Sequence, residues 1–65
     1  MANRIPRAAT RLRVSWKISG SACPAGTITE AYKNDQGWHM DVNGKTWYLF
    51  VSMLRNSEIC DIEVV

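Results

Sequence analysis

Hydrophobic and polar side chains alternate strictly over residues 11–18. Every second side chain is apolar, and those between them are basic or serine. A period of two is typical of a strand with one buried face, as found in antiparallel sheets. The pattern therefore predicts a half-buried strand over residues 11–18, followed by a loop over residues 19–26, where turn-forming residues are dense.

Three further strands are predicted in the middle of the chain. Residues 27–33 are rich in β-branched side chains and end at a polar break over residues 34–37. Residues 38–42 and 45–51 flank Asn43 and Gly44. These two residues favour the positive φ values of a type I′ turn, which makes them a strong signal for a two-residue hairpin.

The hairpin turn fixes which side chains share a face. Val42 should lie opposite Lys45, Met40 opposite Trp47, and Trp38 opposite Leu49, on a face that is nearly all apolar. The other face should hold the pairs Asp41–Thr46 and His39–Tyr48, with Phe50 just beyond them. Apolar side chains from all five strands and the helical turn form the predicted core: Leu12, Val14, Trp16, Ile28, Trp38, Met40, Val42, Trp47, Leu49, Leu54 and Ile62.

The end of the chain completes an all-β pattern. Residues 52–56 lack alternation and suit one helical turn, and residues 59–65 alternate again as a fifth strand. Five short strands with a helical turn before the last one predict a small closed barrel, because closure hides the sheet edges. Residues 11–65 form this domain, and residues 1–10, interrupted by Pro6, are predicted to be a basic arm that is flexible or partly docked.

The chain resembles the Src-homology-3-like small barrels of the Tudor and KOW type. The resemblance rests on Leu12-Arg13-Val14 before a long loop, on Gly26-Thr27-Ile28 at the second strand, and on the runs 37–46 and 47–54. It covers residues 11–65 and is one of architecture. It implies a domain that binds RNA, DNA, ribosomal or polymerase partners or modified peptides, and that is not an enzyme.

Charge is distributed unevenly, although the net charge is only +2. The first 17 residues hold five of the eight basic side chains and none of the six acidic ones. Such asymmetry indicates a basic segment that binds phosphate or an acidic protein surface. The alternative is that this basic end pairs with the acidic C-terminal end inside one domain.

Aromatic and basic side chains on the outward face are the candidate binding residues. Tyr48 and Phe50 lie beside His39 on that face, with Tyr32 as a further candidate, and exposed aromatic rings stack on nucleobases or anchor protein interfaces. A loop or the arm folding over these rings is the alternative. The cations that would neutralise phosphates come from the arm and the first strand: Arg4, Arg7, Arg11, Arg13 and Lys17.

Catalysis, cofactors and metals have no motif in this sequence. His39 is the only histidine and has no recognisable nucleophile beside it. No glycine-rich phosphate loop is present, and Cys23, Cys60 and His39 have the wrong number and spacing for a structural zinc site. We expect a non-enzyme without cofactor, with two reduced thiols in place of a disulfide.

Two functional hypotheses remain open. The first is a nucleic-acid-binding module, and the second is a protein-interaction module, such as a phage- or mobile-element-encoded regulator or inhibitor of a larger protein. A homo-oligomer is compatible with either. No export signal is visible, and the longest apolar run, residues 47–51, is too short to span a bilayer. The expected setting is therefore the cytoplasm, away from a membrane.

Overall fold

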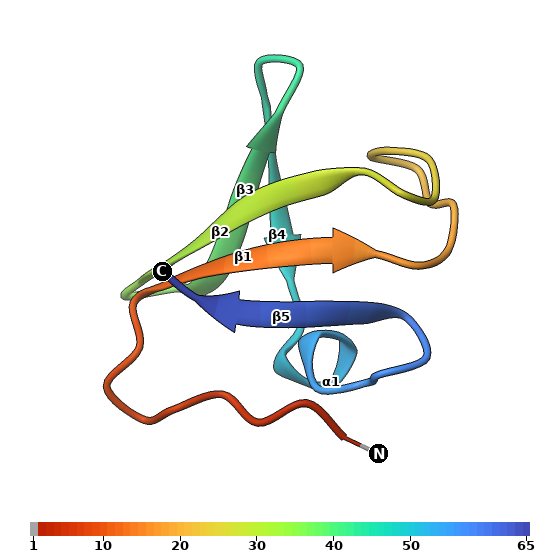
Figure 1. Ribbon diagram of the computed structural model, residues 1–65. Coiled ribbons are helices and arrows are strands. Elements are labelled where there is room, and N and C mark those ends of the chain that lie inside the picture. Colours follow the sequence, from red (N-terminus) through yellow and green to blue (C-terminus); the bar gives the residue numbers. More distant parts are fainter. Residues whose placement is uncertain (1) are drawn as a thin grey trace.

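The computed structural model describes residues 2–65, which form one five-stranded antiparallel sheet and one short helix (Figure 1). The mostly β composition and the helical turn before the last strand are as predicted. The elements, in chain order, are β1 (Arg11–Trp16), β2 (Ile28–Asn34), β3 (Gly37–Val42), β4 (Lys45–Leu49), α1 (Val51–Leu54) and β5 (Cys60–Val64).

The strands are arranged in the order β4-β3-β2-β1-β5. Strands β1 to β4 follow one another as a meander, and β5 returns to pair with β1. In Figure 1 the β3–β4 hairpin stands steeply across β1, and α1 lies beside β5. Within the described residues β4 and β5 are the two ends of the sheet and do not pair, so the sheet is not closed. The predicted closure into a barrel is therefore not confirmed.

The β3–β4 hairpin has the predicted register. Val42 pairs with Lys45, Met40 with Trp47, and Trp38 with Leu49. Asn43 and Gly44 have φ values of 53° and 78°, as a type I′ turn requires.

Strands β1 and β4 each end two residues earlier than the sequence predicts. Strand β1 ends at Trp16, whose amide donates to the carbonyl of Thr27 and whose carbonyl accepts from the Gly26 amide, and Ile18 beyond this point is half exposed. Strand β4 ends at Leu49 because the Phe50 carbonyl accepts hydrogen bonds from the amides of Met53 and Leu54, which start α1.

The core contains most of the predicted side chains, with one clear error. Ile28 is 62% exposed, because Val14 pairs with Thr29 and Leu12 with Ala31. This register turns Thr29 and Ala31 inward and Ile28 outward. Val42, Trp47 and Ile62 are only partly buried, while three small residues that the sequence did not predict are buried: Ala9, Ala31 and Cys60.

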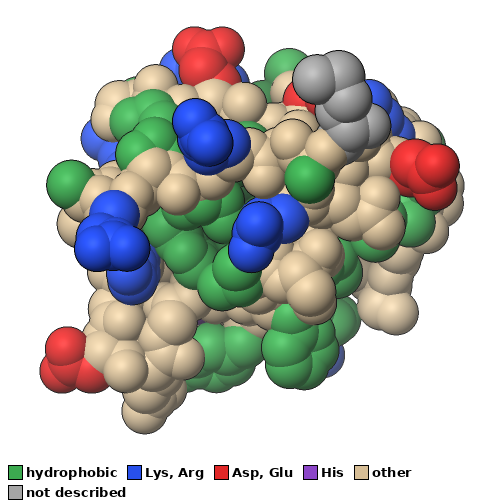
Figure 2. Space-filling view, turned by 90° about the horizontal axis from the view of Figure 1, so that it is seen from below, with side chains coloured by type: hydrophobic (Ala, Val, Ile, Leu, Met, Phe, Trp, Pro, Cys, Tyr) green, Lys and Arg blue, Asp and Glu red, His purple; other side chains and the backbone are tan. Residues whose placement is uncertain are grey.

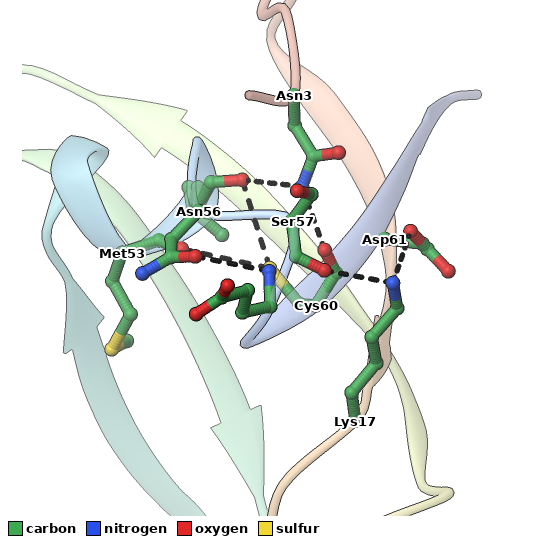
Figure 3. A network of polar contacts seen from close by, with 9 residues as sticks. Asn3, Lys17, Met53, Asn56, Ser57, Cys60 and Asp61 are labelled. Carbon is green, nitrogen blue, oxygen red and sulfur yellow. Dashed lines mark hydrogen bonds and ion pairs between the residues drawn. The ribbon is translucent and has the colours of Figure 1, made fainter. Parts of the chain in front are cut away.

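The arm is docked against the sheet rather than extended away from it. The Asn3 side-chain amide donates to the carbonyls of Leu54 (3.0 Å) and Cys60 (2.7 Å), and the Asn3 backbone amide donates to Arg55 (2.7 Å). Figure 3 shows Asn3 reaching toward the segment that joins α1 to β5.

Candidate nucleic-acid interface

Four side chains form a row across the outer face of the sheet. Arg11 pairs with Tyr32, Tyr32 with His39, and His39 with Tyr48, so each of β1 to β4 contributes one member. The ring centres of Tyr32 and His39 are 6.1 Å apart, and those of His39 and Tyr48 are 6.3 Å apart. The Arg11 guanidinium lies 5.7 Å from the centre of the Tyr32 ring. We call these four residues the aromatic row.

The tyrosines of the aromatic row are held by their hydroxyls, and their rings remain accessible. Tyr32 is 38% exposed and donates a hydrogen bond to the Glu30 carboxylate at 2.7 Å. Tyr48 is 59% exposed and its hydroxyl bonds to the Gln36 side chain at 3.1 Å. Between them, His39 Nδ1 is buried and has no hydrogen-bond partner among residues 2–65.

Glu30 connects the first two members of the row. Its carboxylate accepts from Tyr32 and from Arg11, and these two hydrogen bonds lower the pKa of Glu30 below its usual value. The same bond to Glu30 raises the pKa of Tyr32. The carboxylate therefore stays ionised near neutral pH and fixes one end of the row.

Arg11, Arg13 and Lys17 do project from the outer face, but each contacts a carboxylate. Arg11 is 2.9 Å from Glu30, Arg13 is 3.7 Å from Glu63, and Lys17 is 3.2 Å from Asp61. Lys17 also donates to the Ser57 carbonyl (Figure 3). The last two ion pairs join the basic and acidic ends of the chain, so negative charge accompanies this predicted phosphate-binding row.

Arg4 and Arg7 lie in a different place, at a pocket between the arm and the body of the domain. Lys33 at the end of β2 and Arg55 just after α1 line the same pocket. We call this pocket, of about 590 Å³, the arm pocket. Sequence reasoning missed Lys33 and Arg55, because each is an isolated cation in its own segment, and only the fold brings them beside the arm.

Phe50 is separate from the aromatic row. It is 77% exposed and follows the end of β4, where it lines an apolar groove of about 300 Å³ with Ile18, Cys23, Trp47 and Met53. Tyr48 borders both the groove and the aromatic row. Of the four rings predicted to face outward, Tyr32, His39 and Tyr48 therefore lie in the aromatic row, and Phe50 lies at the apolar groove.

The cysteines are unpaired thiols in different environments. Cys60 is fully buried, and burial raises its pKa, with a further contribution from Asp61. Cys23 is partly buried at the apolar groove. Residues 2–65 contain no cluster of three or more His, Cys, Asp or Glu side chains placed to hold a metal ion.

The two thiols should differ in reactivity. In the native protein we expect a thiol reagent such as iodoacetamide to label Cys23 much faster than Cys60, because the reactive species is the thiolate and Cys60 is both buried and held protonated. Mass spectrometry of a time course measures this, and labelling in denaturant is the control. Equal native rates would contradict the packing of Cys60.

Comparisons with models of known protein families, with curated proteins and with solved structures found no match for this chain. Among the described helices, none is long and apolar enough to cross a membrane.

Proposed function

We propose that the protein is a small, non-enzymatic cytoplasmic module that binds single-stranded nucleic acid on the outer face of its sheet. The observation that carries this proposal is the aromatic row, in which Tyr32, His39 and Tyr48 are in register on adjacent strands. Aromatic side chains mounted on a sheet stack on the unpaired bases of single strands. Each base contributes about 1–3 kcal/mol through such stacking.

The charges near the row limit how phosphates are bound. Glu30 and Glu63 stand beside Arg11 and Arg13, and Asp41 is bound to Thr46 on the same face. Exposed ion pairs contribute only about 0–1 kcal/mol to stability, so phosphates can compete with the carboxylates for these arginines. The carboxylates nevertheless remain on the same face and repel the phosphates. The cations of the arm are therefore the better source of sequence-independent attraction.

The dependence of affinity on salt concentration distinguishes base stacking from phosphate binding. We expect Tyr48→Ala to weaken binding of an unstructured single strand about tenfold, as one lost stacking contact predicts. The slope of log affinity against log salt should stay the same, because a neutral ring releases no counterions. Fluorescence titrations of wild type and variant at several salt concentrations measure both quantities.

Two control variants make the test specific. Tyr48→Phe keeps the ring and should bind like wild type. Phe50→Ala removes a ring that is outside the row and more exposed than Tyr48, and should also leave affinity unchanged. If no single strand binds at low salt, or if Phe50→Ala has the larger effect, stacking on the aromatic row is refuted.

The apolar groove supports a second candidate function, a protein-interaction module that regulates or inhibits a larger protein. Phe50 and Ile18 are exposed at this groove, and exposed apolar surface of this kind marks protein interfaces. This function predicts only weak, featureless attraction to polyanions and no specific effect of Tyr48→Ala.

A further inference from the structure

Half of the basic side chains of the chain line one pocket. Arg4 and Arg7 from the arm, Lys33 from β2 and Arg55 beyond α1 surround the arm pocket, whose apolar walls include Ile5 and Trp38. Figure 2 views the molecule from the side of the arm and shows Lys and Arg side chains gathered around a hydrophobic surface, with acidic side chains toward the periphery.

These four cations differ from Arg11, Arg13 and Lys17 in having no acidic partner among residues 2–65. Arg11, Arg13 and Lys17 form ion pairs, and Lys45 lies over the Trp47 ring. Within residues 2–65, no ion pair involves the four cations of the arm pocket, and no acidic residue lines it. Like charges that share a pocket repel one another, so a bound anion would relieve an unfavourable interaction.

The pocket is held together by hydrogen bonds that join its three segments. Asn3 connects the arm to Leu54 and Arg55 at the end of α1. The Lys33 amide donates to the Thr10 carbonyl at 2.9 Å, which ties β2 to the arm. Because these segments are fixed to one another before a ligand arrives, less conformational entropy is lost on binding.

Charge indicates which anion this pocket suits. An internal phosphodiester carries one negative charge, whereas a terminal phosphomonoester carries about −1.5 to −2 near neutral pH. A phosphorylated strand end together with its first phosphodiester therefore offsets about 2.5–3 of the four positive charges, whereas one internal phosphate offsets about one. A volume of about 590 Å³ is also within the range of pockets that hold small ligands.

We propose that the arm pocket binds the terminal phosphomonoester of a nucleic-acid strand. The proposal rests on the nucleic-acid function inferred above and adds a preference for a chemically defined end. Arginine forks from Arg4, Arg7 and Arg55 donate paired hydrogen bonds to the phosphate oxygens, and Lys33 adds a compact positive charge. Inorganic phosphate and nucleoside monophosphates offer the same chemistry without a strand.

Calorimetric titration with unlabelled single strands of one sequence tests the proposal. The strands carry a 5′-phosphate, a 3′-phosphate, or hydroxyls at both ends. We expect one phosphorylated end to bind about tenfold tighter than the hydroxyl strand, as an added charge-assisted contact predicts. Inorganic phosphate and a nucleoside monophosphate should compete only weakly, because they lack the neighbouring phosphodiester.

Matched variants place the effect in the pocket. Arg4→Gln/Arg55→Gln should abolish the preference for the phosphorylated end. Arg13→Gln/Lys45→Gln removes the same charge from positions outside both the arm pocket and the aromatic row, and should preserve the preference. Thermal melts confirm that both double variants are folded, and Arg55→Lys, which keeps the charge, should retain part of the preference.

The outcomes separate this proposal from the proposed function. If all strands bind equally, or if both double variants lose the preference alike, the end-binding pocket is refuted while single-strand binding stands. If no strand binds but inorganic phosphate shifts the NMR signals of Lys33 and Arg55, the strand-end proposal is overturned in favour of a free phosphate, and the nucleic-acid function fails with it.

Discussion

Trp38→Ala should leave most of the chain unfolded. Trp38 is 3% exposed and pairs with Leu49 on the inner face of the hairpin. Truncating a buried aromatic side chain costs about 3–5 kcal/mol, and a single small core rarely supplies more than that in total. Far-ultraviolet circular dichroism and the urea midpoint measure the loss.

Trp47→Ala and Tyr48→Ala are the matched controls for this substitution. The alternation predicts Trp47 in the core, but its side chain is only partly buried and Lys45 lies over its ring. Replacing Trp47 should therefore reduce the free energy of unfolding by less than replacing Trp38. Tyr48 faces outward and should cost least. A Trp38→Ala variant that melts within a few degrees of wild type would contradict the inner face assigned to the hairpin.

Asn3→Ala should produce the second largest loss of stability. The Asn3 side chain is the donor to the carbonyls of Leu54 and Cys60, two positions that are fully buried (Figure 3). Leaving a buried acceptor without its donor costs about 1–3 kcal/mol, so we expect a total loss of about 2 kcal/mol or more. The urea unfolding midpoint measures it.

Asn34→Ala is the control for Asn3→Ala, because it makes the same chemical change at an exposed position. The Asn34 side chain accepts only from the Gln36 amide in an exposed turn, so its removal should cost much less. Asn3→Asp keeps the size of the side chain but removes the donor, and should be at least as destabilising as Asn3→Ala. Equal midpoints for Asn3→Ala and Asn34→Ala would show that the arm contributes no stability by docking.

Local chemistry is what the sequence predicts well. The hairpin turn and its register follow from Asn43 and Gly44, because positive φ is a property of those residues themselves. Strict alternation likewise predicts the inner face of β1. The prediction for β2 fails at Ile28, because polar and apolar residues occur on both of its faces, and the pairing with β1 decides which face is buried.

The candidate sites divide in the same way. The pairing of His39 with Tyr48 follows from the two-residue turn, and so does half of the aromatic row. Tyr32 joins the row only through the β2–β3 register, and Phe50 leaves it because the chain turns into α1. The β2–β3 register has no local signal in the sequence, and the helical turn begins at Val51, one residue before the loss of alternation predicts.

The sequence by itself therefore determined an all-β chain, its hairpin and the excess of positive charge in its first quarter. Only the tertiary structure decided which cations pair with carboxylates and which remain unpaired. Arg13 and Lys17 meet Glu63 and Asp61 because β5 returns to the edge of β1. Lys33 and Arg55 join the arm because Asn3 docks it there, and contacts between residues this distant in sequence depend on packing that no local pattern encodes.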